Sequence, residues 1–427
     1  MDGSAEMIFT GDELLRGDVT NTNQAYLGEK LLDLGILATR AVCVPDDLPA
    51  IVSAIKDGLS RQPVALILSG GLGPTEDDLT REAVAEALNR PLEHHESLLA
   101  EIRQRFASRG YQMGESNRKQ ASVPRGASTI PISGTAPGFT VKQERTLVAA
   151  LPGVPWELKE MWESTVDARL REHAGAGSGY AVRRIRTFGI GESTAAEMLS
   201  EFDWRGSEIQ IGTRAQIDGL TIVLRGSASP GGREKLDAVQ ARVCEILGER
   251  VFGVDSEGLP EITAELLTRA RLTVAVAESC TGGLVAKRLT DIPGSSDYFI
   301  GGVTAYSNSV KTGILGVPAE LLEAHGAVSH ECAAAMAEKV LALLGAACAL
   351  STTGIAGPGG DSEDKPVGLV YIGSVVGGVT QVERLRLFGR RDQVRERAAL
   401  AALDLLRRRL LRELPSLGRP PLEMPSV

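Results

Sequence analysis

Cysteine is scarce in this sequence of 427 residues, and the five cysteines that occur are widely spaced. None belongs to a C-x-x-C pair, so the pattern indicates neither a thiolate zinc site nor a disulfide framework. Four of them, Cys43, Cys244, Cys332 and Cys348, are expected to be small buried residues. The fifth, Cys280, stands between two hydroxyl residues and needs a separate explanation.

Long hydrophobic runs are also missing. No segment approaches the ~18 consecutive apolar residues that a membrane span requires. The N-terminal sequence MDGSAEMIFTGDELL lacks the basic stretch and apolar block of a secretory signal. With 43% hydrophobic and 24% charged residues, the composition is typical of a folded globular protein. We therefore expect a cytoplasmic protein that has no membrane partner.

Positive charge is in deficit, because the formal net charge is −9. Contacts to nucleic-acid phosphates need clustered lysines and arginines, and this charge argues against such a footprint over the whole protein. The most basic run, residues 390–412, has the periodicity of a helix and is typical of a solvated helix face. We therefore expect no nucleic-acid partner.

The length predicts several domains, at roughly 100–200 residues each, and we expect three. In the first third, strand-like and helix-like segments alternate, which implies a parallel sheet covered by helices on both faces. The expected strands are residues 5–9, 36–44 and 64–69, and the expected helices are 21–35 and 47–59. Ligands bind such sheets beyond the carboxyl ends of the strands, which here lead into the loops 11–23, 44–47 and 70–80.

Two further units follow the small, flexible stretch EHAGAGSG at 172–179. Residues 180–254 read as strand, helix, two strands and helix, which predicts a small α+β module. The third unit has expected helices at 260–270 and 330–345 and strands at 272–277, 298–306 and 347–354, followed by two strands and a long helix. We divide the chain into domains at 1–172, 173–256 and 257–414, with a flexible tail at 415–427.

A glycine-rich loop, GGLGPTEDDLT, joins a buried strand to a helix. Glycines let backbone N–H groups face an anion, and the start of the helix adds partial positive charge, so a phosphate is the natural ligand. The candidate phosphate-binding residues are Gly70, Gly71, Gly73 and Thr75, and a plain tight turn is the alternative. The loop has neither the lysine of a P-loop nor the spacing of a dinucleotide fingerprint.

Carboxylates lie near the same predicted edge of the sheet. Asp77 and Asp78 belong to the glycine-rich loop, and Asp46 and Asp47 follow a strand. Carboxylate oxygens suit Mg²⁺ or Mn²⁺ that bridges to substrate phosphates, but aspartates at these positions also cap helices. The histidines of EHHE at 93–96 have no H-x-x-x-H spacing, so they predict a polar helix start instead of a metal site.

The stretch AESCTGG at 277–283 places Ser279, Cys280 and Thr281 between a predicted strand and a helix-like run. A hydroxyl at the start of a helix can cap it or can act as a nucleophile. The segment YSNSVK supplies Lys311, and no histidine accompanies either segment. A lysine whose pKa is lowered by burial can serve as the base for a serine. Spacing alone leaves both interpretations open.

Six successive segments between residues 11 and 158 carry a family resemblance: GDELLRGDVTNTN, VPDD, GGLGPTEDDLT, ESNRKQASVP, GTAPGF and LPGVPWEL. They resemble the CinA family (competence/damage-inducible protein A), whose first domain is similar to the MoaB/MogA-like, parallel-sheet fold of molybdopterin-binding enzymes. The resemblance implies that this domain hydrolyses ADP-ribose to AMP and ribose 5-phosphate with a divalent metal, Mg, Mn or Co. It assigns Asp46, Asp77 and Asp78 to the metal, and Gly134 and Thr135 to phosphate binding.

A second series resembles the C-terminal domain of the same family, of the α/β nicotinamide-nucleotide amidohydrolase type: ESCTGG, GSSDYFIGGVTAYSN, GVP, HGAVS, TTGIAGPGG and EDKPVG. This resemblance implies hydrolysis of nicotinamide mononucleotide to nicotinic acid mononucleotide and ammonia, without a cofactor. It makes Ser279 the nucleophile and Lys311 its base. The further active-site residues that it implies are Tyr306, Thr353 and Arg391 for catalysis, and Thr281, Gly282, Gly283, Asn308 and Gly354 for the oxyanion or the substrate. Cys280 is expected to pack, because no imidazole is present to lower the pKa of its thiol.

The middle module resembles the KH-like part of the same family. In its FGIGES segment, the acidic residue Glu192 directly follows the glycines, so we expect a spacer or dimerisation element and not an RNA clamp. The resemblance suggests a homodimer. Two other functions stay open: an interaction protein of competence or DNA damage that recruits recombination machinery, and a molybdopterin-binding protein, which rests on fold likeness alone.

Overall fold

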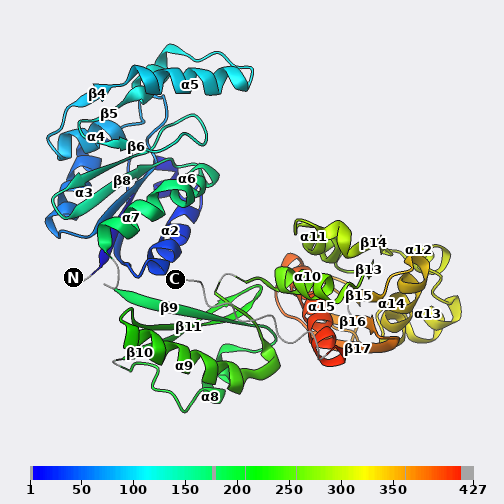
Figure 1. Ribbon diagram of the computed structural model, residues 1–427. Coiled ribbons are helices and arrows are strands. Elements are labelled where there is room, and N and C mark those ends of the chain that lie inside the picture. The colour runs from blue at the N-terminus through cyan, green and yellow to red at the C-terminus, as the bar shows by residue number, and fades with distance from the viewer. Residues whose placement is uncertain (1–2, 176–178, 207, 256, 361, 415–427) are drawn as a thin grey trace. The chain divides into compact units, whose positions relative to one another are not determined.

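The structure, a computed structural model, describes residues 3–175, 179–206, 208–255, 257–360 and 362–414 (Figure 1). The predicted tail at 415–427 and part of the predicted linker at 172–179 lie outside these ranges. Contacts group the chain into two units: residues 1–182, 207–209 and 225–237 form one, and residues 183–206, 210–224 and 238–427 form the other. Within the described ranges, no helix combines the length and apolarity that crossing a bilayer demands.

The first sheet has six strands in the order β2-β1-β3-β8-β7-β6. Its strands are β1 (Ser4–Thr10), β2 (Leu37–Val44), β3 (Ala65–Ser69), β6 (Ser128–Thr129), β7 (Phe139–Gln143) and β8 (Thr146–Leu151). The accompanying helices are α1 (Asp12–Arg16), α2 (Thr22–Asp33), α3 (Leu48–Ser60), α4 (Thr80–Ala87), α5 (Glu96–Ser108), η1 (Glu115–Ala121), α6 (Pro155–Met161), η2 (Trp162–Val166) and α7 (Asp167–Ala174), with a small pair of strands, β4 (Leu92–His94) and β5 (Ser122–Pro124). The strands and helices predicted for the first 70 residues are therefore confirmed.

This sheet is mixed, whereas the sequence predicted a parallel one. Strands β2, β1, β3 and β8 are mutually parallel, but β7 runs antiparallel to β8 and β6 antiparallel to β7. Only Glu144 and Arg145 separate β7 from β8. A connection of two residues makes a hairpin and cannot provide the crossover that parallel strands need. The predicted α/β class is confirmed with this correction.

Alternate residues of β1 face two separate cores. Ile8 packs into a core with α3, α4 and α5, and Met7 and Phe9 pack into another with α2, α6 and α7. Helices therefore cover both faces, as predicted, and the carboxyl ends of the parallel strands open at one edge.

The middle module has a sheet of four strands in the order β10-β11-β9-β12. Its elements are β9 (Tyr180–Thr187), α8 (Glu192–Met198), β10 (Ile209–Gln216), β11 (Gly219–Ser227), α9 (Pro230–Leu247), η3 (Gly248–Arg250) and β12 (Val251–Val254). The predicted α+β pattern is confirmed, and only β12 was not predicted. It is four residues long and follows the helix directly, so its sequence shows too little alternation to mark a strand.

The C-terminal sheet has five strands in the order β14-β13-β15-β16-β17. Its elements are α10 (Leu259–Ala270), β13 (Val274–Glu278), α11 (Leu284–Thr290), η4 (Ser295–Asp297), β14 (Phe299–Thr304), α12 (Asn308–Gly313), α13 (Ala319–His325), α14 (His330–Leu344), β15 (Cys348–Gly354), β16 (Leu369–Val376), β17 (Val379–Arg386) and α15 (Arg391–Glu413). Strands β14, β13 and β15 are parallel, and β16 and β17 form an antiparallel hairpin around Gly377 and Gly378. Both glycines have positive φ, as a hairpin turn of two residues requires.

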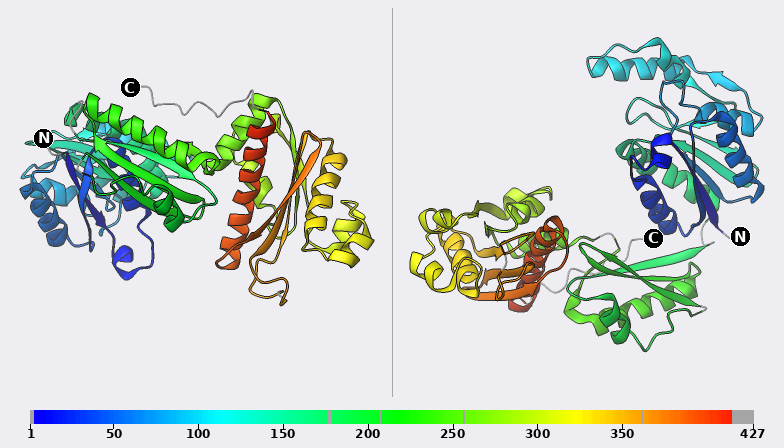
Figure 2. Two further views of the ribbon diagram at one scale, coloured as in Figure 1. Left: turned by 90° about the horizontal axis from the view of Figure 1, so that it is seen from below. Right: turned by 180° about the vertical axis from the view of Figure 1, so that it is seen from behind.

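Strand β13 belongs to the middle layer of a three-layer arrangement, in which helices cover both faces of the sheet. Val274 and Val276 pack with α10, α11 and α15, and Ala275 and Ala277 pack with α14 on the other face. Figure 2 shows α15 on one side of the strands and α13 and α14 on the other. The alternation of side chains along one strand thus fixes which helix covers which face.

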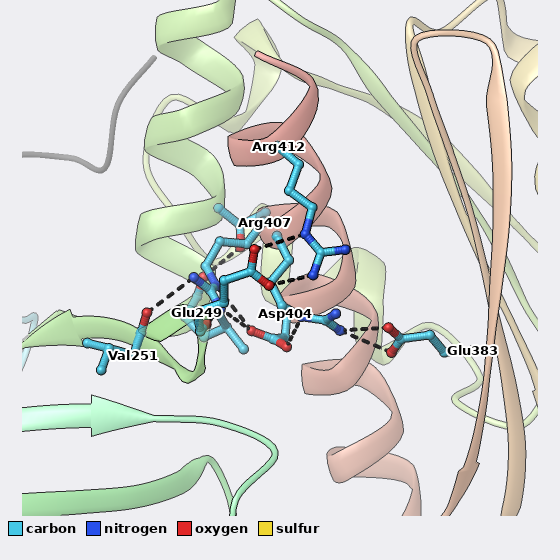
Figure 3. Close-up of polar contacts among 9 residues, drawn as sticks. Glu249, Val251, Glu383, Asp404, Arg407 and Arg412 are labelled. Carbon is cyan, nitrogen blue, oxygen red and sulfur yellow. Dashed lines mark hydrogen bonds and ion pairs between the residues drawn. The ribbon is translucent and has the colours of Figure 1, made fainter. Parts of the chain in front are cut away.

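The last helix is also tied to the end of the middle module. Arg407, which is 2% exposed, donates hydrogen bonds to the carbonyls of Glu249 (2.6 Å) and Val251 (3.3 Å) and pairs with Asp404 at 2.7 Å (Figure 3). Nearer the end of the helix, Arg412 pairs with the Glu249 side chain at the surface. The predicted solvated helix face is therefore only partly right, since Arg407 is buried.

Candidate active sites

Three parallel strand ends meet at one edge of the C-terminal sheet. Glu278, the last residue of β13, is in register with Thr304 of β14 and Thr352 of β15. The residues that follow these strands are therefore brought together: Ser279 after β13, Ala305 after β14 and Thr353 at the end of β15. This is the edge at which ligands bind in sheets of this kind.

Ser279 and Lys311, which the sequence predicted as a pair, are in hydrogen-bond contact. Lys311 Nζ lies 3.1 Å from Ser279 Oγ, 2.7 Å from the carbonyl oxygen of Ala305 and 3.2 Å from that of Tyr306. Both side chains are buried, because Lys311 is 1% and Ser279 9% exposed. Burial lowers the pKa of Lys311, and no carboxylate of the described residues forms an ion pair with it.

Local sequence explains how Lys311 reaches this position. Ser307 caps α12 by accepting a hydrogen bond from the N–H of Val310, which starts the helix directly after β14. Lys311 then lies in the first turns of α12, and its side chain returns to the carbonyls at the end of the strand.

Glu278 caps α11, so the predicted cap by Ser279 or Thr281 is wrong. The Glu278 carboxylate, 2% exposed, accepts hydrogen bonds from the N–H groups of Gly283 (2.9 Å), Val285 (3.1 Å) and Ala286 (2.8 Å). A carboxylate at the start of a helix is favoured by the partial positive charge there. Ser279 is consequently free of capping.

The turn itself engages two of the three predicted oxyanion donors. The N–H of Gly282 donates to Ser279 O (3.2 Å) and that of Gly283 to Glu278. The Thr281 hydroxyl is buried against that of Thr352 at 2.6 Å. Among the described residues, no acceptor takes the backbone N–H of Thr281 or of Cys280, and Thr281 is 0% exposed.

A cavity of about 220 Å³ opens over the pair. Its lining residues are Ser279, Cys280, Tyr306, Asn308, Lys311, Ala327, Val328, Thr353, Gly354, Ala356 and Arg391. All five residues predicted for catalysis are thus brought together around it, with Asn308 and Gly354. Cys280 is also part of the wall, but burial raises the pKa of its thiol to about 12, which agrees with the expectation that it packs.

Polar side chains of the cavity wall make hydrogen bonds to other residues of the site. Arg391 donates to the hydroxyl of Tyr306 (2.9 Å) and to the carbonyl of Gly357 (2.8 Å). Thr353 donates to the carbonyl of Ala327 at 2.6 Å. The hydroxyl of Thr353 therefore positions the opposite wall in this structure.

Sequence reasoning missed two residues of this site, Glu278 and Arg395. Arg395 donates to the carbonyls of Cys280 (3.2 Å) and Thr281 (2.7 Å) from α15. It follows Arg391 by four residues on a predicted helix, so the two share a helix face. That spacing was the signal that could have identified it.

In the N-terminal domain, the glycine-rich loop is held by its own aspartate. Asp78 accepts hydrogen bonds from the N–H groups of Gly73 and Thr75, both at 2.8 Å, and from the Thr75 hydroxyl. The amides of Gly73 and Thr75, predicted to bind phosphate, are therefore occupied here. Gly70 also donates internally, to Leu151 O. The prediction that these amides donate to a phosphate is therefore corrected at Gly70, Gly73 and Thr75. Among the described residues, the N–H of Gly71 makes no such hydrogen bond.

The second predicted phosphate loop faces a carboxylate. Glu157, 9% exposed, lies so close to Gly134 that no Cβ would fit there, next to Thr135. Burial raises the pKa of Glu157, while the charge of Arg109 opposes the shift. A phosphate bound at Gly134 would meet this side chain.

The predicted metal carboxylates divide into two groups. Asp46 exchanges hydrogen bonds with Asp12 (3.1 and 3.4 Å). Burial raises the pKa of Asp46, and the carboxylates of Glu13, Asp12 and Asp77 raise it further. Asp78 faces the loop instead. Asp47 caps α3 by accepting from Ala50 N at 3.0 Å, as the capping alternative proposed.

No group of three or more His, Cys, Asp or Glu side chains in the described parts of the chain is arranged to hold a metal ion. His94 ends β4, His95 is the N-cap residue of α5 and Glu96 its first residue, so the predicted helix start is confirmed for the second half of EHHE. A hollow of about 550 Å³ in the N-terminal domain is lined by Met7, Asn21, Gln24, Ala25, Gly28, Ala38, Thr39, Arg40 and Ala41. None of the predicted site residues belongs to it.

Comparison with known proteins finds three family models along the chain. Residues 6–172 match "Probable molybdopterin binding domain", residues 182–253 match "Damage-inducible protein CinA KH domain" and residues 256–410 match "CinA C-terminal domain". A competence-damage inducible protein of Symbiobacterium thermophilum is 42% identical over 421 residues, which are 95% of this chain and 99% of that protein. A CinA-like protein of Gloeothece citriformis is 42% identical over 419 residues, 96% of this chain and 99% of that protein.

Solved structures are similar to part of this chain. A crystal structure of a competence/damage inducible protein from Agrobacterium tumefaciens is 40% identical, with a TM-score of 0.34, and covers 35% of this chain and 93% of its own. One of CinA from Thermoplasma acidophilum is 33% identical, with a TM-score of 0.37, and covers 39% of this chain and 97% of its own.

Proposed function

The chain belongs to the CinA family, and from this membership we propose that its C-terminal domain hydrolyses the carboxamide of nicotinamide mononucleotide through Ser279 and Lys311. The observation that carries the proposal is the 3.1 Å contact between Ser279 Oγ and Lys311 Nζ inside a buried cavity. A serine becomes a nucleophile when a neighbouring base can take its proton.

The surroundings of Lys311 favour the neutral amine. A neutral amine has two N–H groups and one lone pair. The carbonyls of Ala305 and Tyr306 accept the two N–H groups, which leaves the lone pair facing the hydroxyl of Ser279. Burial disfavours the ammonium, since no carboxylate of the described residues compensates its charge. Lys311 is therefore suited to accept a proton.

The mechanism follows from these contacts. Lys311 takes the Ser279 proton as Oγ bonds to the carboxamide carbon, and a backbone N–H of the turn that follows Ser279, where Cys280 lines the cavity, stabilises the oxyanion. The C–N bond then breaks, and the nitrogen takes the electron pair and the proton from Lys311 to leave as ammonia. Water attacks the resulting ester and passes its proton through Lys311 to Ser279, which releases the carboxylic acid.

The cavity supports a substrate that is only partly enclosed. Ligand pockets usually measure about 300–1,000 Å³, and this one measures about 220 Å³. We propose that the nicotinamide ring enters it and that the phosphate stays at the rim, near Arg391 and Asn308, which are exposed.

The test is ammonia release from nicotinamide mononucleotide by three variants. Ser279→Ala and Lys311→Met should each lose at least about 10³-fold in kcat, and Cys280→Ala is the matched control from the same turn. A mass increase on Ser279 during turnover would identify the acyl-enzyme. Full turnover by Ser279→Ala would contradict the mechanism.

For the N-terminal domain we propose hydrolysis of the diphosphate of ADP-ribose, which yields AMP and ribose 5-phosphate, with a divalent metal. Asp46 and Asp77 would hold the ion, and substrate phosphates and waters would complete its shell, as Mg²⁺ commonly requires. The donor set fits, because burial and then the charges of Glu13, Asp12 and Asp77 raise the pKa of Asp46, and a cation would offset the negative charge gathered there. When bound, the metal polarises phosphoryl oxygens and activates water.

Asp46→Asn tests this second proposal, with Asp47→Asn as its neighbour control, since Asp47 caps α3. Only Asp46→Asn should lose ADP-ribose hydrolysis, and a chelator should abolish the wild-type reaction while ammonia release continues. Hydrolysis that survives both chelation and Asp46→Asn would refute the metal site.

The names of the relatives support a second candidate function, because several are described as competence-damage inducible. Under this alternative the chain recruits recombination proteins, and a pull-down with the Ser279→Ala and Asp46→Asn double variant tests whether such binding needs either site. Molybdopterin binding is a further alternative supported by the matching family model, and a direct binding titration tests it. We also propose a cytoplasmic homodimer, which light scattering of the purified protein can test.

A further inference from the structure

Glu157, in the first turn of α6, is a carboxylate that the proposed reactions do not use. It is 9% exposed, and it makes no hydrogen bond or ion pair with any described residue. The charge of Arg109 reaches it, but the Arg109 guanidinium donates to the carbonyl of Ser133 instead. The Glu157 oxygens are not among the described side-chain atoms that are both wholly buried and unpartnered, so they stay open to solvent. An acceptor is therefore left available.

This carboxylate is unfavourable for the fold. An ion that is buried without a partner loses its hydration and gains nothing in return, and burial accordingly raises the pKa of Glu157. Gly134 provides the room for the side chain, since a Cβ there would overlap the carboxylate. An arrangement that involves two positions and does not stabilise the domain is typical of a functional site.

Glu157 lies near the edge of the sheet at which ligands bind. Strands β3 and β8 are parallel neighbours, so the loops that follow them emerge together. The N–H of Gly70 donates to Leu151 O at 3.0 Å, and a Cβ on Gly153 would lie 3.4 Å from Gly70 Cα. The segment that leads from β8 to Glu157 therefore lies against the glycine-rich loop, and one nucleotide can contact both.

The chemistry of this corner distinguishes the parts of a nucleotide. An ionised carboxylate only accepts hydrogen bonds, so Glu157 repels phosphate and attracts hydroxyl or amino groups. Thr135 is partly exposed, and its hydroxyl makes no hydrogen bond within the described chain. A sugar hydroxyl both donates and accepts, which matches this pair of side chains. Val154 and Trp156 are 45% and 51% exposed and add apolar surface directly before Glu157 in the chain.

We propose that Glu157 and Thr135 bind the ribose hydroxyls of a nucleotide whose base lies on the exposed Val154 and Trp156 and whose phosphates lie toward the glycine-rich loop. This rests on the ADP-ribose hydrolysis proposed above and specifies how its AMP half is held. Glu157 binds the substrate away from the reacting phosphorus. Its loss should therefore raise KM for ADP-ribose and leave kcat nearly unchanged, because the contact is equally present before and in the transition state.

Isothermal titration with AMP in the presence of a chelator measures this contact without metal or turnover. Glu157→Gln removes the charge, and Gly134→Ala displaces the carboxylate with its Cβ. Glu160→Gln is the matched control, because Glu160 is exposed on the same helix. We expect the affinity for AMP to fall about 10–100-fold in the first two variants, as for lost hydrogen bonds to a charged group, and to change less than about twofold in the control.

Two further probes identify the group that Glu157 binds. 2′,3′-Dideoxy-AMP lacks the ribose hydroxyls, and inosine monophosphate lacks the amino group of adenine. We expect the dideoxy nucleotide to bind the wild type and Glu157→Gln equally, and inosine monophosphate to depend on Glu157 as AMP does. If inosine monophosphate is instead the probe that loses this dependence, Glu157 binds the amino group and the ribose assignment is wrong.

A measurement of stability separates binding from a structural role. Glu157→Gln should unfold at the same urea concentration as the wild type or a higher one, because it removes a buried charge without a partner. A lower midpoint, together with a loss of AMP binding that only follows the folded fraction, would overturn the proposal.

The two proposals for this domain can fail separately. If the wild type binds AMP in a manner that depends on Glu157 but does not hydrolyse ADP-ribose, the hydrolysis is wrong and the ribose site stands. If Glu157→Gln hydrolyses ADP-ribose with unchanged KM and binds AMP as the wild type does, the ribose site is refuted. Absence of AMP binding by the wild type would also refute it.

Discussion

Lys311 illustrates how much a single side chain depends on its surroundings. The resemblance identified it as a base, and burial is what gives a lysine that role. The sequence could not show the carbonyls of Ala305 and Tyr306 as acceptors, because they belong to the backbone that precedes its own helix. The identity of the base was therefore predictable from the sequence, whereas the hydrogen-bond acceptors of its amino group could be identified only in the structure.

The lowered pKa of Lys311 predicts a pH dependence of stability. In the unfolded chain Lys311 has its ordinary pKa of 10.5, so the unfolded chain binds the proton of this lysine more tightly than the folded chain does. Stability therefore rises as the pH increases from the folded pKa toward 10.5. Lys311→Met lacks this dependence, so in urea titrations the wild-type free energy of unfolding should increase relative to that of the variant as the pH rises toward 10.5. A constant difference would contradict the lowered pKa.

The cysteines give a second residue-level prediction. Cys43 is exposed, and Cys244, Cys280, Cys332 and Cys348 are buried. Burial raises the pKa of Cys280 to about 12, so almost none of it is thiolate near neutral pH. N-ethylmaleimide should modify Cys43 first in the native protein, as peptide mass spectrometry would show, without loss of ammonia release. Rapid inactivation through Cys280 would contradict its packing role.

At the scale of elements, Glu278 joins a strand to a helix. Glu278→Ala leaves three N–H groups at the start of α11, one buried and two part-buried, without their acceptor, so we expect the free energy of unfolding to fall by about 2–4 kcal/mol. Glu320→Ala removes an acidic residue from the first turn of α13 that makes no cap, and should cost at most about 1 kcal/mol. Urea denaturation measures both. Equal effects would show that the Glu278 contacts contribute little.

The elements themselves were largely predictable, and their connections explain the exceptions. Strands and helices of strong periodicity, such as β3 and α14, occur where the sequence placed them. The hairpin of β7 and β8 was missed, because its turn, Glu144 and Arg145, contains no glycine or asparagine to signal it. In the turn after β13, the hydroxyls of Ser279 and Thr281 suggested a cap, but the buried Glu278 reaches more of the N–H groups.

At the scale of the whole molecule, the predicted division into three domains and the division by contacts differ. The contacts assign most of the middle module to the unit that contains the C-terminal domain. Within that unit, Arg407 connects α15 to the carbonyls of Glu249 and Val251. Sequence periodicity had suggested a solvated face for this run, and it could not distinguish the buried Arg407 and Arg409 from the exposed Arg412.

This connection predicts that the end of the middle module and α15 unfold together. Arg407→Met removes one of two arginine partners of Asp404, which keeps Arg408 at 2.8 Å, and takes a buried donor from the carbonyls of Glu249 and Val251, so we expect a loss of about 1–3 kcal/mol. Arg412→Met breaks only the exposed pair with Glu249 and should cost about 1 kcal/mol or less. Calorimetry and hydrogen exchange at β12 measure both effects. Faster exchange at β12 in Arg407→Met alone is expected, and equal exchange in the two variants would show that Arg407 does not couple these elements.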